Sequence, residues 1–206
     1  MRLSWITVVL ALVASAIPVQ AQQPESPWDF PDFSGTQVFP TGKYDITMKV
    51  YRSGSDVRVE RDANGMAPEL WITASRKAYN ISVYADGKRS CEVSTPEQAL
   101  MMPSPLELLF GAKVMRTPAG TEVVEGHPCK VEKVVVTRMD GKTTVESKVW
   151  EAEDLKGVPV KIESQHPGGA HLTVVYRDIV LGTPDKALFT PPDKCTPFEK
   201  MWQVAK

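Results

Sequence analysis

The three cysteines, Cys91, Cys129 and Cys195, are the side chains of this sequence best suited to covalent chemistry. In an oxidising compartment two of them would form a disulfide and leave one thiol, and three pairings are possible. Cys129 shares a strand face with Val131, whereas Cys91 and Cys195 each stand between polar neighbours. We therefore favour a disulfide between Cys91 and Cys195 with Cys129 buried, although sequence alone leaves the connectivity open.

Histidines and carboxylates could bind a metal or transfer protons, but their spacing favours neither. His127 lies far from His166 and His171, and no closely spaced second pair of ligands accompanies it. The sequence also has no nucleophile elbow, phosphate loop, HExxH or paired-cysteine redox motif. We interpret His127 as a turn residue and expect no metal, no cofactor and no enzymatic activity. Three carboxylates lie together on a predicted connecting segment: Glu151, Glu153 and Asp154. A group of this kind is typical of a solvated surface.

The first 21 residues have the three parts of a secretory signal, namely Arg2, an apolar run over 6–17 and a small-residue ending at Ala21. We expect cleavage after Ala21 and export, to the periplasm or beyond the cell. The apolar run is too short to span a bilayer, and no second run of membrane length follows. An exported chain would meet oxidising conditions, and a disulfide needs such conditions to form.

Length and charge narrow the classes of partner. The 206 residues, less the signal, suffice for one domain with a core but are few for two. The 24 basic and 25 acidic residues nearly balance and form no basic block, which argues against nucleic acid as a partner. We divide the chain into the signal 1–21, a proline-rich segment 22–42 that docks on the domain, the domain 43–198, and a tail 199–206.

Apolar residues with a period of two predict that the domain is mainly β. From Tyr44 to Val50 they alternate with polar residues, and similar patterns recur between turns about ten residues apart. Strands over 129–137 and 143–150 flank a turn at Asp140-Gly141, and a third begins at Val158. Because no βαβ crossover is visible, we predict an antiparallel sheet.

The period changes after Thr95, where two short apolar helices are predicted. Thr95 and Ser104 each precede a proline and begin a helix, and Pro103 and Gly111 end them. Methionines suit a surface that adapts to varied apolar ligands. The apolar side chains of these helices are Leu100, Met101, Met102, Leu106, Leu109 and Phe110.

Several motifs resemble those of a bacterial family of exported domains of unknown function and, at fold level, the LolA/LolB-like lipoprotein carriers. The resemblance implies a strongly curved antiparallel sheet, a half-barrel, with short helices covering an apolar concave face. In the lipoprotein carriers that cavity takes acyl chains. The motifs are Gly126–Cys129, Val149-Trp150, Asp154–Lys161, Gly182–Asp185, Leu188-Phe189 and Pro191-Pro192.

Two functions of different classes fit these expectations. In the first, an exported non-enzymatic protein binds an apolar small molecule, a lipid or a lipidated protein in the half-barrel, with Trp71, Trp150 and the helix residues as cavity wall and lid. In the second, the same side chains simply fill the core, and the protein is a structural or interaction module of the cell envelope. A curved sheet offers more inward apolar positions than two short helices cover, so we favour the first.

Overall fold

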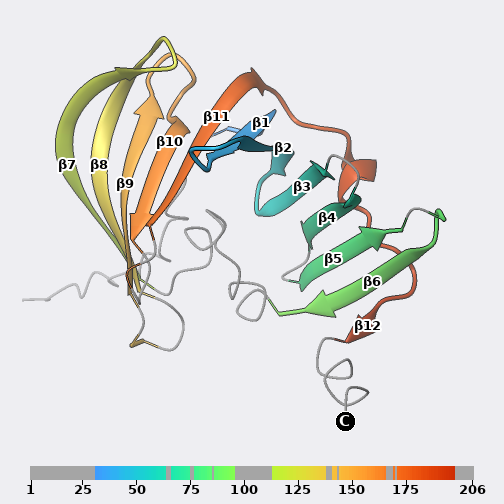
Figure 1. Cartoon of the computed structure of the whole chain (residues 1–206). Helices are drawn as coiled ribbons and strands as arrows, with labels where there is room; N and C mark the ends of the chain where they lie inside the picture. Colours follow the sequence, from blue (N-terminus) through green and yellow to red (C-terminus); the bar gives the residue numbers. More distant parts are fainter. Residues whose placement is uncertain are drawn as a thin grey trace, which may run out of the picture.

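The computed structural model describes residues 31–63, 66–74, 77–84, 86–95, 113–137, 141–142, 144–165, 169 and 171–197. These residues form one bent sheet of 12 strands that does not close into a barrel (Figure 1). The mainly β, curved antiparallel fold predicted from the sequence is thus confirmed. The strands are β1 (Phe33–Pro40), β2 (Asp45–Ser53), β3 (Asp56–Ala63), β4 (Met66–Ala74), β5 (Lys77–Val83), β6 (Arg89–Ser94), β7 (Lys113–Val124), β8 (His127–Thr137), β9 (Thr144–Ala152), β10 (Val158–Gln165), β11 (His171–Leu181) and β12 (Thr196–Pro197).

The sheet is built from hairpins, with one long-range pairing at its centre. Its order is β12-β6-β5-β4-β3-β2-β1-β11-β10-β9-β8-β7, so β1 joins the two runs of hairpins by pairing with β11. Neighbouring strands are antiparallel except β12, which lies parallel to β6 through two residue pairs. The edges of this described sheet are therefore β7 and the short β12.

Strand β1 lies in the segment that the sequence analysis placed outside the domain. The structure places it between β2 and β11, in the middle of the sheet, so the predicted boundary at residue 43 cuts through the domain. Phe33 and Val38 are both 3% exposed, and this burial makes the segment a core strand despite its prolines. Pro40 is the last residue of β1, where a missing N–H is tolerated.

Strand β7 is continuous through Pro118-Ala119-Gly120, residue types that usually mark a turn. Its pairing with β8 shifts register between Pro118 and Gly120, so the proline is absorbed in a bulge of an edge strand. Register shifts also occur in other strand pairs, and such bulges bend a sheet. These shifts lie between Ser34 and Thr36, Arg61 and Ala63, and Pro159 and Lys161.

The predicted helices over residues 95–111 lie outside the described residues, since nothing from 96 to 112 is described. The signal 1–21 and the tail 199–206 lie outside them too. The described chain does contain a short 3-10 helix, η2 (Lys186–Phe189), which Asp185 caps by accepting from the Ala187 N–H. In the described part of the chain, no helix combines the length and apolar character needed to cross a membrane.

The C-terminal segment is fastened to the sheet at two places. The Arg58 guanidinium in β3 donates to the Leu188 carbonyl at 2.7 Å, and Phe189 beside it is buried. Further along, Cys195 forms a disulfide with Cys91 of β6, which is the pairing favoured from the sequence, and Cys129 is a buried free thiol. The described chain after β11 therefore returns across the sheet and reaches the β6 edge at Cys195 to Pro197.

Asp32 joins three separate segments at one end of the sheet. Its carboxylate accepts hydrogen bonds from the Gly54 N–H at 2.7 Å, the Thr183 hydroxyl at 2.9 Å and the Ser53 hydroxyl at 3.3 Å. The Gly54 N–H is the main cause that holds the pKa of Asp32 below its ordinary value, against a smaller opposing effect of burial. The ionised carboxylate thus stabilises the folded state.

This arrangement predicts an acid-sensitive contribution to stability. Because the folded-state pKa of Asp32 is lowered, the contribution is complete above about pH 4 and is lost as the pH falls through the folded-state pKa. We expect Asp32→Asn to lower the free energy of unfolding by about 1 kcal/mol at pH 7, a value reduced for solvent exposure. Urea unfolding should show this difference shrinking below pH 4, and a constant difference down to pH 2 would contradict it.

Candidate ligand-binding face

One face of the sheet carries a continuous apolar surface, here called the apolar face. Its side chains alternate along each strand with those of the opposite, polar face, as the pleat requires. Val134, Val149 and Val158 are 0% exposed and belong to this cluster. The buried residues of the cluster come from seven adjacent strands: Phe33, Val50, Val57, Val59, Val134, Val136, Val149, Val158, Ile162, Val174 and Tyr176.

Of the two main clusters buried in the described sheet, the one on the apolar face is the larger. It packs as one group over β1–β3 and β8–β11. At the margins of this group lie apolar side chains that are only partly buried, including Phe39, Met48 and Leu172. These marginal side chains are the part of the face that a ligand could reach first.

Four buried polar side chains in the described strands interrupt the apolar face, namely Gln37, Arg52, Ser147 and Ser164. The Ser147 and Ser164 hydroxyls, on neighbouring strands β9 and β10, lie 2.8 Å apart and share a hydrogen bond while both are buried. Tyr176 packs edge-on against Phe33, with ring centroids 6.2 Å apart. Burial raises the pKa of Tyr176 well above its ordinary range, so its hydroxyl stays neutral.

Charged groups occupy one border of the apolar face, next to the β7 edge. The Arg116 guanidinium forms an ion pair with Glu132 at 2.5 Å and a second with Glu151. Burial raises the pKa of Glu151, while Arg116 opposes that effect. An arginine shared between two carboxylates thus forms a charged, ion-paired group at this border of the face.

Trp150 lies on the polar face rather than in the predicted cavity wall. It follows Val149 of the apolar face by one residue, so its side chain points to the other side of β9. There it joins a second buried cluster with Cys129, Val131, Ala152 and Val160. The structure therefore separates Trp150 from the apolar face.

Cations and a carboxylate surround the Trp150 ring. The Nζ atoms of Lys148 and Lys161 each lie 4.4 Å from the ring centroid, a cation–π distance. The Trp150 Nε1–H donates to Glu122 at 2.7 Å. With its N–H and ring face engaged in these contacts, Trp150 is a core residue of the second cluster and not part of the predicted cavity wall.

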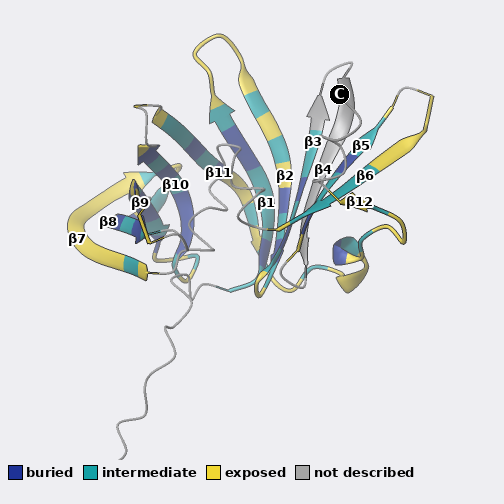
Figure 2. Cartoon of the chain, turned by 90° about the horizontal axis from the view of Figure 1, so that it is seen from below, coloured by how far each residue is buried: buried dark blue, intermediate teal, exposed yellow. Residues whose placement is uncertain are grey.

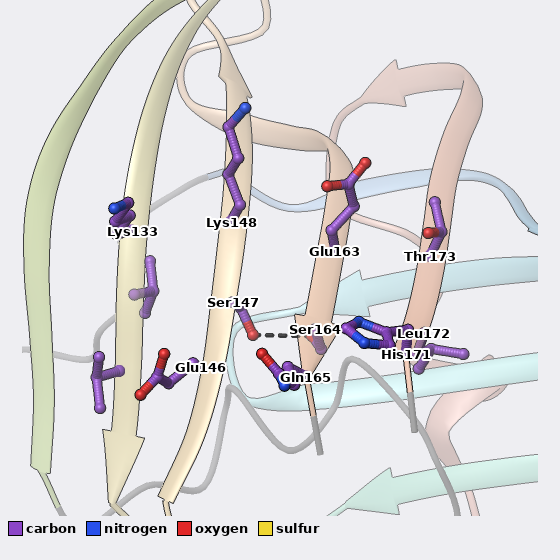
Figure 3. A pocket seen from close by; sticks show the side chains of 12 residues that line it. Lys133, Glu146, Ser147, Lys148, Glu163, Ser164, Gln165, His171, Leu172 and Thr173 are labelled. Atoms are coloured by element: carbon purple, nitrogen blue, oxygen red, sulfur yellow. Dashed lines mark hydrogen bonds between the residues drawn. The ribbon is translucent and has the colours of Figure 1, made fainter. Parts of the chain in front are cut away.

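A pocket of about 360 Å³ lies along β8–β11 (Figure 3). Figure 3 shows Lys148 and Glu163 at facing positions of β9 and β10, as their register requires. The mixture of charges suits a polar group rather than an acyl chain. Polar and charged side chains that line the pocket are Lys133, Glu146, Lys148, Glu163, Gln165 and His171.

Cys129 and His127 are close in the chain but form no nucleophilic pair. The Cys129 thiol donates to the His127 backbone carbonyl at 3.3 Å, and the His127 ring bonds Asp154 through Nδ1 at 2.8 Å. Burial raises the pKa of Cys129, and the charge of Asp154 adds to this effect, so the reactive thiolate is disfavoured. Within the described residues, no group of three or more potential metal ligands gathers, either around His127 or elsewhere.

The remaining predicted site residues are only partly placed. Trp71 lies in β4 with its backbone in register with Val59, a residue of the apolar face. The predicted lid residues lie outside the described residues; they are Leu100, Met101, Met102, Leu106, Leu109 and Phe110. The sequence analysis missed Ser147 and Ser164, although two polar residues at inward positions of neighbouring apolar strands are a readable signal.

The fold and the face define a class of protein, a mainly β protein built on one bent, open sheet whose larger apolar cluster covers one face. No protein-family model matches the chain, and no curated protein matches it. Among solved structures, it is similar to a domain from Vibrio parahaemolyticus described as an outer membrane lipoprotein-sorting protein. That similarity has 13% identity and a TM-score of 0.32, and it covers 78% of this chain and 89% of that one.

Two further structures are similar. A DUF1329 family protein from Desulfovibrio piger has 10% identity and a TM-score of 0.33, with 80% of this chain and 91% of that chain covered. The protein PNGF-II has 12% identity and a TM-score of 0.46, with 85% and 32% covered. The lipoprotein-sorting domain and the DUF1329 protein are of the kinds that the sequence resemblance named. Because the TM-scores are below 0.5, we assign neither family nor function from these similarities.

Proposed function

We propose that this is an exported, non-enzymatic protein that binds an apolar ligand, either a lipid or the lipid group of a modified protein, on the apolar face. The supporting observation is a cluster of mainly branched aliphatic side chains that spans seven strands and reaches margins at Phe39, Met48 and Leu172. Acyl chains gain free energy from such a face in proportion to the area they bury, about 25 cal/mol per Å². The lipoprotein-sorting description belongs to a similar structure and supports the proposal only in kind.

The second candidate is the envelope module with a filled core. It is favoured by the complete burial of Val134, Val149 and Val158, which is what a packed core predicts. In this case the marginal side chains would be ordinary core periphery, and the protein would take up no apolar molecule. The two candidates differ in a measurable property, namely the uptake of an apolar probe.

Adjacent residues on opposite faces of β11 offer a matched test. Leu172 packs against the apolar cluster, whereas Thr173 faces Glu163 on the polar face, and both are partly buried. If ligands bind the apolar face, Leu172→Asp should weaken the uptake of a fluorescent fatty acid at least tenfold, because a carboxylate would need to be desolvated. Thr173→Asp should leave uptake within about twofold of the unchanged protein.

A second pair keeps the test decisive if Leu172→Asp fails to fold. Met48 and Lys49 are likewise adjacent residues on opposite faces of one strand, β2. Met48 packs against the apolar cluster, and Lys49 is exposed. Circular dichroism of each variant separates a loss of fold from a loss of uptake. No uptake by the unchanged protein, or equal uptake by Met48→Asp and Lys49→Asp, would reject ligand binding on this face.

A further inference from the structure

Two hairpin tips expose a tyrosine each at the same end of the sheet. Tyr44, in the β1–β2 connection, is 67% exposed, and Tyr84, in the β5–β6 connection, is 53% exposed. Antiparallel hairpins in the order β1 to β6 place these two connections at one end and the β2–β3 and β4–β5 connections at the other. Figure 2 shows both hairpins extending toward the same side of the molecule.

Local hydrogen bonds hold both tips in fixed conformations. In the first tip, the Tyr44 N–H donates to the Thr41 hydroxyl and the Thr41 N–H donates to the Tyr44 carbonyl, each at 3.3 Å. In the second tip, the Tyr84 N–H donates to the Lys88 carbonyl at 2.8 Å, and the Gly87 N–H donates to the Tyr84 carbonyl at 2.9 Å. These turn conformations therefore place the two tyrosine rings in exposed positions.

The charge near these tips differs from that at the opposite end. Lys43, Lys88 and Arg89 lie beside the tyrosines and are exposed, against two carboxylates, Asp45 and Asp86, the latter paired with Lys88 at 2.8 Å. The described segments at the opposite end carry five carboxylates, Asp56, Glu125, Glu153, Asp154 and Asp185, against three lysines, Lys77, Lys156 and Lys186, so this end is net acidic. A negatively charged surface would thus attract the tyrosine end of the sheet and repel the other end.

We propose that this end of the sheet, the tyrosine tips with Lys43 and Arg89, docks on a membrane surface that contains anionic lipid. Tyrosine favours the membrane–water interface because its ring is apolar and its hydroxyl is polar, and nearby cations are attracted to anionic headgroups. The apolar face reaches the same end, where Phe39 and Leu172 are its outermost side chains near the tips. The inference rests in part on the proposed function, since docking there would bring a lipid to the open end of the apolar face.

Vesicle sedimentation tests the docking with two variants. The protein, purified from the exported fraction, is mixed with vesicles of phosphatidylcholine alone or with one quarter phosphatidylglycerol. The unchanged protein should bind the anionic vesicles, and the binding should fall with added salt. Tyr44→Ser with Tyr84→Ser, and separately Lys43→Glu with Arg89→Glu, should each weaken the binding at least tenfold.

Equally exposed apolar residues at the opposite end provide the control. Val123 and Val180 are 70% and 64% exposed, so Val123→Ser with Val180→Ser removes similar apolar area and should leave the binding within twofold. No vesicle binding by the unchanged protein, or an equal loss in the control variant, would overturn the docking proposal. Circular dichroism should show all variants folded, because every substituted side chain is exposed.

Uptake of the fluorescent fatty acid, measured without vesicles, separates this proposal from the proposed function. The tyrosine variant should lose vesicle binding and keep uptake. Uptake without any vesicle binding would overturn the docking proposal alone. Vesicle binding without uptake would support docking and reject the carrier function.

Discussion

Removal of the disulfide between Cys91 and Cys195 is expected to lower the free energy of unfolding by about 4–5 kcal/mol. The two residues are 104 positions apart, so the bond closes a long loop and strongly restricts the unfolded chain. It also holds the C-terminal segment at the sheet edge, where β12 contributes only two residue pairs. Guanidinium unfolding of Cys91→Ser with Cys195→Ser, compared with the unchanged protein, measures the effect.

Cys129→Ser is the matched control for this experiment. Cys129 is a free thiol outside the disulfide, so the reductant dithiothreitol should destabilise Cys129→Ser as much as it destabilises the unchanged protein. Reductant should have no further effect on the protein that lacks Cys91 and Cys195. A loss below about 1 kcal/mol on removing the pair would show that the bond does not constrain the unfolded chain as proposed.

Trp150→Ala is expected to cost about 3–5 kcal/mol of the free energy of unfolding, the usual range for deleting a buried aromatic side chain. Trp150 is 2% exposed and lies at the centre of the second buried cluster. The substitution would leave a cavity and would also deprive Lys148 and Lys161 of their cation–π contacts. Thermal and guanidinium unfolding, monitored by circular dichroism, measure the change.

Trp150→Phe distinguishes packing from bonding at this position. Phenylalanine keeps most of the ring but cannot donate to Glu122, so we expect a smaller loss of about 1–2 kcal/mol. Uptake of apolar ligand should be unaffected in Trp150→Phe, because the ring lies on the polar face. Reduced uptake in this folded variant would show that the assignment of Trp150 to the polar face is wrong.

The sequence predicted the sheet well because its strands follow one simple rule, the period-two alternation of apolar residues between turns. The start of β10 coincides with its predicted position, and β8 and β9 differ from theirs by two residues or fewer at each end. β1 was missed because prolines surround it and its burial depends on the distant strand β11, with which it pairs. A pairing of that kind leaves no local trace in the sequence.

The candidate site was predicted less completely than the fold. The continuous apolar face followed from the alternation, but the side to which Trp150 points depends on one residue of register, which a pattern of strongly apolar neighbours does not fix. The favoured pairing of Cys91 with Cys195 matches the structure because polar surroundings distinguished these cysteines from Cys129. The exposure of Tyr44 and Tyr84 depends on turn geometry, and for Tyr44 the alternation favoured a place within a strand.

Native mass spectrometry of the full chain, purified without detergent, tests most directly whether the apolar face holds a ligand. We expect a population heavier than the bare chain by the mass of a lipid, and this population should disappear in Leu172→Asp and persist in Thr173→Asp. A single mass equal to the bare chain, together with no binding of added fatty acid, would contradict ligand carriage and favour a filled core.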